Sequence, residues 1–165
     1  MTHPTHHHLS IRAAILTVSD TRTIADDRSG QRIQALLEEA SFTLADYQIV
    51  QDEPAEISRY VQNWCDDSTI HAIIITGGTG FTARDQTYDT VAPLFDKEMT
   101  GFGELFRTLS YNEIGAKAMF SRATAGSRKQ TAIYVLPGST NAVTLAMTQL
   151  ILPTIQHFVG ELQRL

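Results

Sequence analysis

Cysteine is nearly absent from this chain of 165 residues, since Cys65 is the only one. An internal disulfide and a cysteine-rich zinc site are therefore excluded, and the amphipathic run around Cys65 favours a small buried hydrophobe over a reactive thiol. No run approaches the ~18 consecutive apolar residues of a membrane span, and no apolar signal region precedes the first predicted strand. A soluble cytoplasmic protein with no membrane partner is the expectation.

Basic residues are also scarce, because 13 Lys and Arg face 18 Asp and Glu and the formal net charge is −5. A protein that neutralises nucleic-acid phosphates needs basic runs, so nucleic-acid binding is disfavoured. The length suits one domain with a substantial core, and no repeat or low-complexity linker divides it. We expect this domain over residues 11–165. It follows a flexible histidine-containing segment, residues 1–10, for which a metal-binding role is disfavoured.

Apolar runs of strand length alternate with stretches of helical periodicity. The predicted strands are residues 11–18, 43–50, 71–76 and 131–136. Helices are predicted at about residues 29–40, 54–66, 87–95, 142–150 and 154–162. A turn is predicted at residues 100–103 and a polar loop at residues 121–126. Parallel pairing with right-handed crossovers then gives a three-layer α/β/α sandwich with a mostly parallel central sheet.

The most informative stretch is residues 73–89, with the sequence I-I-I-T-G-G-T-G-F-T-A-R-D-Q-T-Y-D. Its consecutive isoleucines suit a buried central strand, which stops at Thr76. Gly77, Gly78 and Gly80 can adopt positive φ and let backbone N–H groups converge. That arrangement suits a concave cradle for an anion at the start of a helix.

Several interpretations of this stretch remain open. The lysine that a P-loop places after its last glycine is missing, because Phe81 follows Gly80. A dinucleotide fingerprint, G-x-G-x-x-A, begins at Gly78, but that fingerprint normally follows the first strand of a fold. An arginine and the carboxylates of Asp85 and Asp89 form the inventory of a metal-assisted phosphate site. A tight turn followed by a solvated, charged helix start explains the same residues.

Other polar residues follow the remaining predicted strands. Ser19 and Asp20 follow the first, Asp52 follows the second, and a glycine turn at Gly138 and Ser139 follows the last. Open α/β sheets bind ligands beyond the carboxyl ends of their strands. We therefore expect these groups to lie together at that end of the sheet, which we call the rim. An ordinary N-cap explains Ser139 as well as a phosphate pocket does, and Asp52 equally suits an acid that stabilises a helix dipole.

The string T-G-G-T-G-F-T-x-R-D-x-T-x-D resembles the signature of the MoaB/MogA family of molybdenum cofactor biosynthesis proteins. Further motifs occur in the family's order: L-T-V-S-D from residue 16, S-G from 29, G-F-G-E-L-F-R from 101, S-R from 121, A-G from 125 and L-P-G-S from 136. The match spans about residues 11–155. The segments L-F-D-K-E-M-T-G-F-G-E and L-S-Y-N-E-I-G make the chain more similar to the MoaB branch.

The resemblance implies a molybdopterin adenylyltransferase, in which the molybdopterin phosphate attacks the α-phosphorus of ATP and pyrophosphate is released. It assigns Asp52 and Asp85 to catalysis and to a magnesium ion, with ATP as co-substrate. An anionic phosphate nucleophile needs no general base, so positioning and charge screening suffice. The implied nucleotide and phosphate residues are Ser19, Asp20, Gly77, Gly78, Thr79 and Gly80, and the implied molybdopterin residues are Gly138, Ser139, Glu104 and Ser110.

A non-catalytic molybdopterin-binding or scaffold protein of the same pathway is the alternative. Tyr88 stands where relatives commonly have proline, which leaves the shape of the rim open. Asn141 stands where some relatives have lysine, which would leave the molybdopterin phosphate with one charge partner fewer. The family forms trimers and sometimes hexamers, so we expect a trimer-based assembly with an interface among the apolar residues between 102 and 120.

Overall fold

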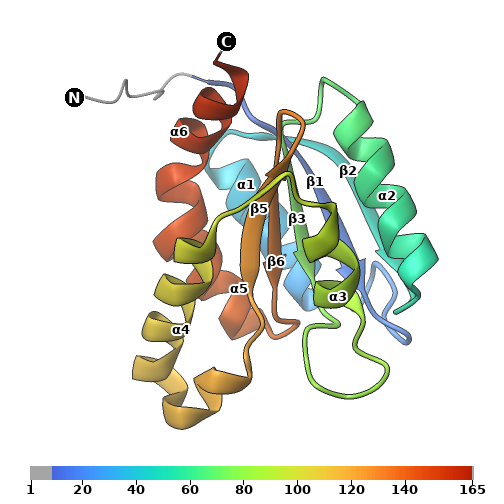
Figure 1. Ribbon diagram of the computed structural model, residues 1–165, viewed down its shortest axis with the longest axis vertical. Helices are drawn as coiled ribbons and strands as arrows, with labels where there is room; N and C mark the ends of the chain where they lie inside the picture. Colours follow the sequence, from blue (N-terminus) through green and yellow to red (C-terminus); the bar gives the residue numbers. More distant parts are fainter. Residues whose placement is uncertain (1–8, 165) are drawn as a thin grey trace.

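One six-stranded sheet forms the centre of the computed structural model, which describes residues 9–164 (Figure 1). The predicted flexible segment therefore lies almost wholly outside the described residues. The strand order is β2-β1-β3-β6-β5-β4. The parallel strands are β1 (Arg12–Val18), β2 (Thr43–Val50), β3 (Ala72–Thr76) and β6 (Thr131–Leu136). The antiparallel strands are β5 (Thr124–Arg128) and β4 (Lys97–Glu98).

Helices cover both faces of this sheet (Figure 1). One face carries α1 (Arg28–Glu39), α4 (Thr100–Ile114), α5 (Thr140–Ala146) and α6 (Leu152–Gln163). The other face carries α2 (Pro54–Asp66) and α3 (Thr87–Val91). Short 3₁₀ helices follow at η1 (Ala92–Leu94) and η2 (Gly115–Phe120). The predicted three-layer sandwich with a mostly parallel sheet is confirmed.

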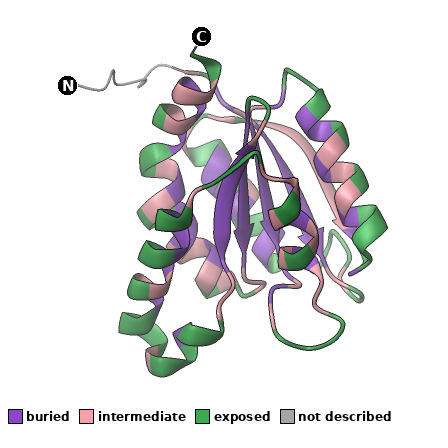
Figure 2. Ribbon diagram, in the orientation of Figure 1, coloured by how far each residue is buried: buried purple, intermediate pink, exposed green. Residues whose placement is uncertain are grey.

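The central strands are buried on both faces, as Figure 2 shows. Side chains alternate along β3, so that Ile74 joins the core beneath α1, α4 and α6, whereas Ile73 and Ile75 join the core beneath α2. A continuous run of β-branched residues suits a strand that is covered on both sides. The strand ends at Thr76, and the glycine loop begins at Gly77, whose φ of +97° does not fit a strand.

Two predictions for the middle of the chain are wrong. The segment expected as a polar loop, residues 121–126, contains the first three residues of β5, whose T-A-G-S-R sequence has few bulky side chains and gains its hydrogen-bonded partner from β6. The expected turn at residues 100–103 is the first turn of α4. Gly103 suits this helix because a Cβ there would stand 2.7 Å from the Ala123 carbonyl oxygen. The helix can therefore lie close to the chain that leads into β5.

The predicted break before Pro153 is also wrong, because α5 and α6 form one continuous helix through a π-helical turn at Met147–Ile151. Proline cannot donate an intrahelical hydrogen bond, and the wider π-helical turn just before Pro153 lets the helix continue past the missing donor. Among residues 9–164, the stretch Thr140–Gln163 is the helix long and apolar enough to cross a membrane. Its buried side chains belong to the core under the sheet.

Truncation of Ile74 tests the assignment of the core. This side chain has no exposed surface, so Ile74→Ala leaves a cavity and should lower the free energy of unfolding by about 2–5 kcal/mol. Urea denaturation followed by circular dichroism measures the change. Ile24→Ala is the matched control, because Ile24 is 53% exposed and the same truncation should change stability by less than about 0.5 kcal/mol. Equal losses in the two variants would contradict this core.

Candidate functional site

The loops that follow the parallel strands meet at the rim, beyond the carboxyl ends of these strands. Ser19 N–H donates to the Val50 carbonyl oxygen at 2.8 Å, which joins the ends of β1 and β2. The Thr76 hydroxyl donates to the Pro137 carbonyl oxygen at 2.9 Å, which joins the ends of β3 and β6. The structure therefore brings the polar residues after all four strands to one rim.

Two glycine turns touch at the centre of this rim. Gly77 has φ of +97°, and a Cβ there would stand 2.2 Å from the Val18 carbonyl oxygen. A Cβ on Gly138 would stand 3.3 Å from Gly77 Cα. Gly78 has φ of +67°, and its missing Cβ leaves room for Thr87 and for the carboxylate of Asp52. Gly77 and Gly78 therefore require glycine both for their backbone conformation and for space.

The glycine loop leaves a row of backbone donors without protein acceptors. Gly77 N–H donates to the Leu136 carbonyl oxygen at 3.1 Å, as part of the sheet's end. In the part of the chain that the structure describes, no acceptor takes a hydrogen bond from the next four N–H groups, those of Gly78, Thr79, Gly80 and Phe81. Successive free N–H groups in a loop suit an anion, and the anion site stays a prediction.

Asp52 is the buried acid of the rim, with 6% of its surface exposed. Its Oδ1 accepts a hydrogen bond from Gln86 N–H at 3.0 Å, and its own N–H donates to Asp20 Oδ1 at 3.0 Å. Burial raises the pKa of the Asp52 carboxyl, the Gln86 hydrogen bond opposes that rise, and the charges of Asp85 and Asp20 add to it. The site therefore concentrates negative charge that a cation would relieve.

Asp85 lies beneath the other side of the same loop. Its Oδ2 accepts hydrogen bonds from Thr82 N–H at 3.0 Å and from the Thr82 hydroxyl at 2.7 Å. A Cβ on Gly80 would stand 2.7 Å from this oxygen, just as a Cβ on Gly78 would stand 2.6 Å from Asp52 Oδ2. The two carboxylates therefore both lie against the glycine loop.

Arg84 ties three loops of the rim together. Its guanidinium donates to both carboxylate oxygens of Asp20 at 2.9 Å, and to Glu53 at 2.8 Å. These hydrogen bonds lower the pKa of Asp20 to about 2. The partners are solvent-exposed, so the ion pairs add little stability, but they fix the loops after β1, β2 and β3 relative to one another.

The carboxylates fit a magnesium ion only in company with a substrate. Among residues 9–164, no group of three or more His, Cys, Asp and Glu side chains could hold a metal. Magnesium needs fewer protein ligands than such a group provides, because one or two carboxylates commonly hold it together with phosphate oxygens and water. Asp52 and Asp85 each keep one carboxylate oxygen that no hydrogen bond from the described protein occupies. The pair therefore suits a cation that is shared with a polyphosphate.

The second glycine turn is held from behind by α1 and the loop before it. The Gly138 carbonyl oxygen accepts from the Ser29 hydroxyl at 2.7 Å and from both terminal nitrogens of Arg22 at 3.3 Å. Ser139 is the N-cap of α5, with its hydroxyl oxygen accepting from Ala142 N–H at 3.1 Å. This is the ordinary capping role that the sequence left open, and the hydroxyl proton stays available for a ligand.

Sequence reasoning missed the buried acid that organises this support. Asp27 is the N-cap of α1 and accepts from Gly30 N–H at 3.1 Å, whereas Ser29 lies in the first turn. Asp27 also accepts a hydrogen bond from the Tyr47 hydroxyl and pairs with Arg22 at 3.6 Å. An aspartate just before a helical pattern is an N-cap signal that could have identified it.

Ser19 and Asp20 face a separate hollow of about 440 Å³ between the loop after β1 and the edge strand β2. The Ser19 side-chain oxygen accepts from Arg22 N–H at 3.0 Å, so it also orders its own loop. Asp20 is bound by Arg84. The structure thus places these two predicted residues beside the glycine loop rather than within its row of free donors.

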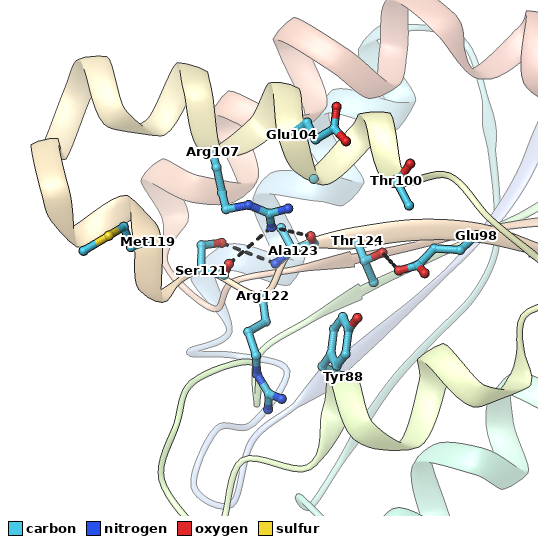
Figure 3. Close-up of a pocket in the computed structure, with 11 residues that line it drawn as sticks. Tyr88, Glu98, Thr100, Glu104, Arg107, Met119, Ser121, Arg122, Ala123 and Thr124 are labelled. Carbon is cyan, nitrogen blue, oxygen red and sulfur yellow. Dashed lines mark hydrogen bonds between the residues drawn. The ribbon is translucent and has the colours of Figure 1, made fainter.

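A pocket of about 490 Å³ opens between α3, α4 and the start of β5 (Figure 3). Glu104, one of the implied molybdopterin residues, lies on its α4 wall, and Tyr88 lies on the opposite wall. Ser110 is buried in α4 and is not brought to this pocket. The pocket is lined by Tyr88, Glu98, Thr100, Gly103, Glu104, Arg107, Met119, Ser121, Arg122, Ala123 and Thr124.

Comparison with known proteins decides the family. The model of the family described as a probable molybdopterin binding domain matches residues 14–157. The chain belongs to this family. Within the molybdopterin-binding family, molybdenum cofactor biosynthesis protein B of Bacillus subtilis (strain 168) is 47% identical over 155 residues, which are 93% of this chain and 91% of that relative.

Solved structures of molybdopterin-binding family proteins share the fold. A crystal structure of a molybdenum cofactor biosynthesis protein B has a TM-score of 0.92 at 44% identity, and the match covers 95% of this chain and 98% of that one. The tungsten cofactor synthesizing protein MoaB from Pyrococcus furiosus has a TM-score of 0.84 at 33% identity, with 94% and 98% covered. The predicted MoaB/MogA membership and fold are confirmed.

Asp52→Asn tests the electrostatic cost of this rim. Because the folded-state pKa of Asp52 is raised, its carboxylate destabilises the fold as pH rises from the ordinary aspartate value, about 3.9, through the raised pKa. With divalent cations chelated, we expect Asp52→Asn to match or exceed the parent's free energy of unfolding at pH 7. This advantage should vanish below about pH 3.9, where both forms are neutral. Urea denaturation across this range measures it.

Asp67→Asn is the control with the opposite sign. Hydrogen bonds from Thr69 lower the pKa of Asp67, so its charge contributes stability above the ordinary aspartate pKa, and this contribution is lost as pH falls through the lowered value. The Asp67 variant should therefore lose stability at pH 7 and converge with the parent in acid. An Asp52 variant that behaved in the same way would contradict the assigned electrostatics.

Proposed function

We propose that this protein is a molybdopterin adenylyltransferase of molybdenum cofactor biosynthesis, acting in the cytoplasm. A phosphate oxygen of molybdopterin attacks the α-phosphorus of ATP, and a bond forms between them. The bond from that phosphorus to the bridging β-phosphate oxygen breaks, and pyrophosphate leaves with the electron pair. The names of the relatives support the pathway, since they are molybdenum cofactor biosynthesis proteins.

The observation that carries the proposed reaction is the row of free amides flanked by two carboxylates. The N–H groups of residues 78–81 offer hydrogen bonds to phosphate oxygens without a lysine. Fixed donors of this kind stabilise charge that develops during phosphoryl transfer. A phosphate nucleophile is already anionic, so this chain needs to position it rather than deprotonate it.

Asp52 and Asp85 would hold the magnesium ion that accompanies ATP. Bound magnesium would neutralise charge on the polyphosphate and the leaving pyrophosphate. Asp52 is the better buried of the two and is fixed by Gln86, so it has one orientation in which to meet a cation. Asp85 is held by Thr82 in the same way.

Molybdopterin would bind with its phosphate at the second glycine turn and its pterin in the pocket of Figure 3. The Ser139 hydroxyl can donate to a phosphate oxygen at the exposed N-terminus of α5. Carboxylates of Glu98 and Glu104 line the pocket, and they can accept hydrogen bonds from the amino and ring N–H groups of a pterin. Ser110 is not included, because it is buried away from the pocket.

An assay with molybdopterin, ATP and magnesium tests the reaction. We expect the purified protein to release pyrophosphate, and Asp85→Asn to lower the rate by about 100-fold or more because a metal ligand is lost. Chelation of the metal should abolish turnover of the parent. Asp67→Asn is the matched control, since Asp67 is the C-cap of α2 and precedes β3, at the opposite end of the strands from the rim.

Two outcomes would decide against this function. Parent-like turnover in folded Asp85→Asn would remove Asp85 from the proposed metal site. Tight molybdopterin binding by the parent without any release of pyrophosphate would favour the alternative, a non-catalytic molybdopterin-binding protein.

A trimer-based assembly is also part of the proposal. Large apolar side chains on α4 and η2 are more than half exposed, which is unusual for a surface without a partner. These residues are Leu105, Tyr111, Ile114, Met119 and Phe120.

Light scattering coupled to size-exclusion chromatography tests this assembly. We expect the mass of a trimer or hexamer for the parent, and a shift toward monomer for Ile114→Glu, because a buried charge in an interface is costly. Ile24→Glu is the control, since Ile24 is similarly exposed but lies in the loop before α1. A monomeric parent would overturn the predicted assembly.

A further inference from the structure

Arg122 binds backbone carbonyl groups of the glycine loop. The residue precedes β5 and points from the pocket of Figure 3 toward the loop after β3. Its Nε donates to the Thr79 carbonyl oxygen at 3.4 Å, and a terminal nitrogen donates to the Gly80 carbonyl oxygen at 3.2 Å. Both terminal nitrogens donate to the carboxylate of Asp89 at 3.0 Å.

These contacts set the direction of two amide N–H groups. In a planar trans peptide the carbonyl oxygen and the following N–H point in opposite directions. Because Arg122 holds the carbonyl oxygens of Thr79 and Gly80, the N–H groups of Gly80 and Phe81 point away from the guanidinium. Without such a restraint, glycine could rotate these peptides through many conformations.

Aromatic rings and a carboxylate hold Arg122 in place. The guanidinium carbon lies 5.2 Å from the ring centroid of Phe81 and 5.0 Å from that of Tyr88, within the range of cation–π attraction. Phe81 in turn contacts the Phe120 ring edge to face at 6.2 Å between centroids. Asp89 accepts from both terminal nitrogens, which is the most specific geometry for an arginine–carboxylate pair.

We propose that Arg122 is a positioning residue, which aims the free amides of the glycine loop at a bound polyphosphate and is itself locked by Asp89. The inference rests on the proposed function, because it assigns the polyphosphate of ATP to this loop. Protein acceptors take four of the guanidinium's N–H groups, and an arginine has only five. Arg122 therefore has little capacity left to bind the ligand directly.

Removal of the Asp89 charge separates positioning from direct attraction. If Arg122 acted as a free cation, Asp89→Asn would make the site more positive and would leave ATP binding unchanged or stronger. If Arg122 positions the loop, Asp89→Asn should weaken ATP binding about 3-fold or more, in the same direction as Arg122→Gln, for which we expect about 10-fold. Isothermal titration calorimetry with magnesium and ATP gives both dissociation constants.

Arg59→Gln is the matched control for the loss of an arginine. Arg59 also pairs with a carboxylate, Glu56, at 2.8 Å and lies 4.5 Å from an aromatic ring, that of Tyr60. It contacts no carbonyl of the glycine loop, so its replacement should leave the dissociation constant for ATP unchanged. Thermal unfolding of all variants checks that a change in binding does not reflect loss of the fold.

Amide resonances provide a readout that a general loss of stability would not produce. In the parent, ATP with magnesium should shift the amide resonances of Gly80 and Phe81 in nitrogen–proton correlation spectra. Both rim variants, Arg122→Gln and Asp89→Asn, should reduce these shifts while core resonances keep their positions. Parent-like ATP affinity and parent-like shifts in both variants would overturn the positioning role.

The positioning inference and the proposed function fail in different ways. A parent protein that binds no ATP, or binds it without shifts at residues 78–81, would remove the proposed function at this loop and the inference with it. A parent that binds ATP there and releases pyrophosphate, with Asp89→Asn binding ATP as well as or better than the parent, would remove only the positioning role of Arg122.

Discussion

Close contact of three backbone segments at Gly77 is the constraint on which the rim depends. The end of β1 presents the Val18 carbonyl oxygen where a Cβ of Gly77 would be, and Gly138 packs against Gly77 Cα. Any side chain at residue 77 would push these strand ends apart and would need a positive φ as well. Because the strand ends stay in contact, the loops after β1, β3 and β6 share one surface instead of three separate ones.

Under the proposed function, the charges at this surface would serve a cation and an anion together. Four acids lie around the glycine loop: Asp20, Asp52, Glu53 and Asp85. Arg84 pairs only with the two exposed ones, Asp20 and Glu53. A bare polyphosphate would meet this negative field and be repelled, whereas its complex with a divalent cation would be attracted. The free amides then supply the hydrogen bonds to phosphate that no lysine provides. The proposed phosphate site is thus compatible with a net charge of −5.

Arginine side chains support both glycine turns by binding their carbonyl oxygens. Arg22 donates to the Gly138 carbonyl oxygen, and Arg122 donates to those of Thr79 and Gly80. In each case the positive charge binds backbone and a buried or bidentate carboxylate rather than standing free in the cleft. The flexibility that glycine needs to make these turns is thereby limited once the fold is complete.

The sequence by itself determined the parallel strands, the helices between them and the position of the glycine loop, because apolar periodicity and glycine act within a few residues. It also placed Asp52 after β2 and Asp85 in the loop after β3. Only the tertiary structure decided that residues 124–128 form a strand, since their hydrogen bonds come from β6, and that Ser110 is buried. The pairing of Arg122 with Asp89, 33 residues away in the chain, is likewise a product of packing, which no local pattern encodes.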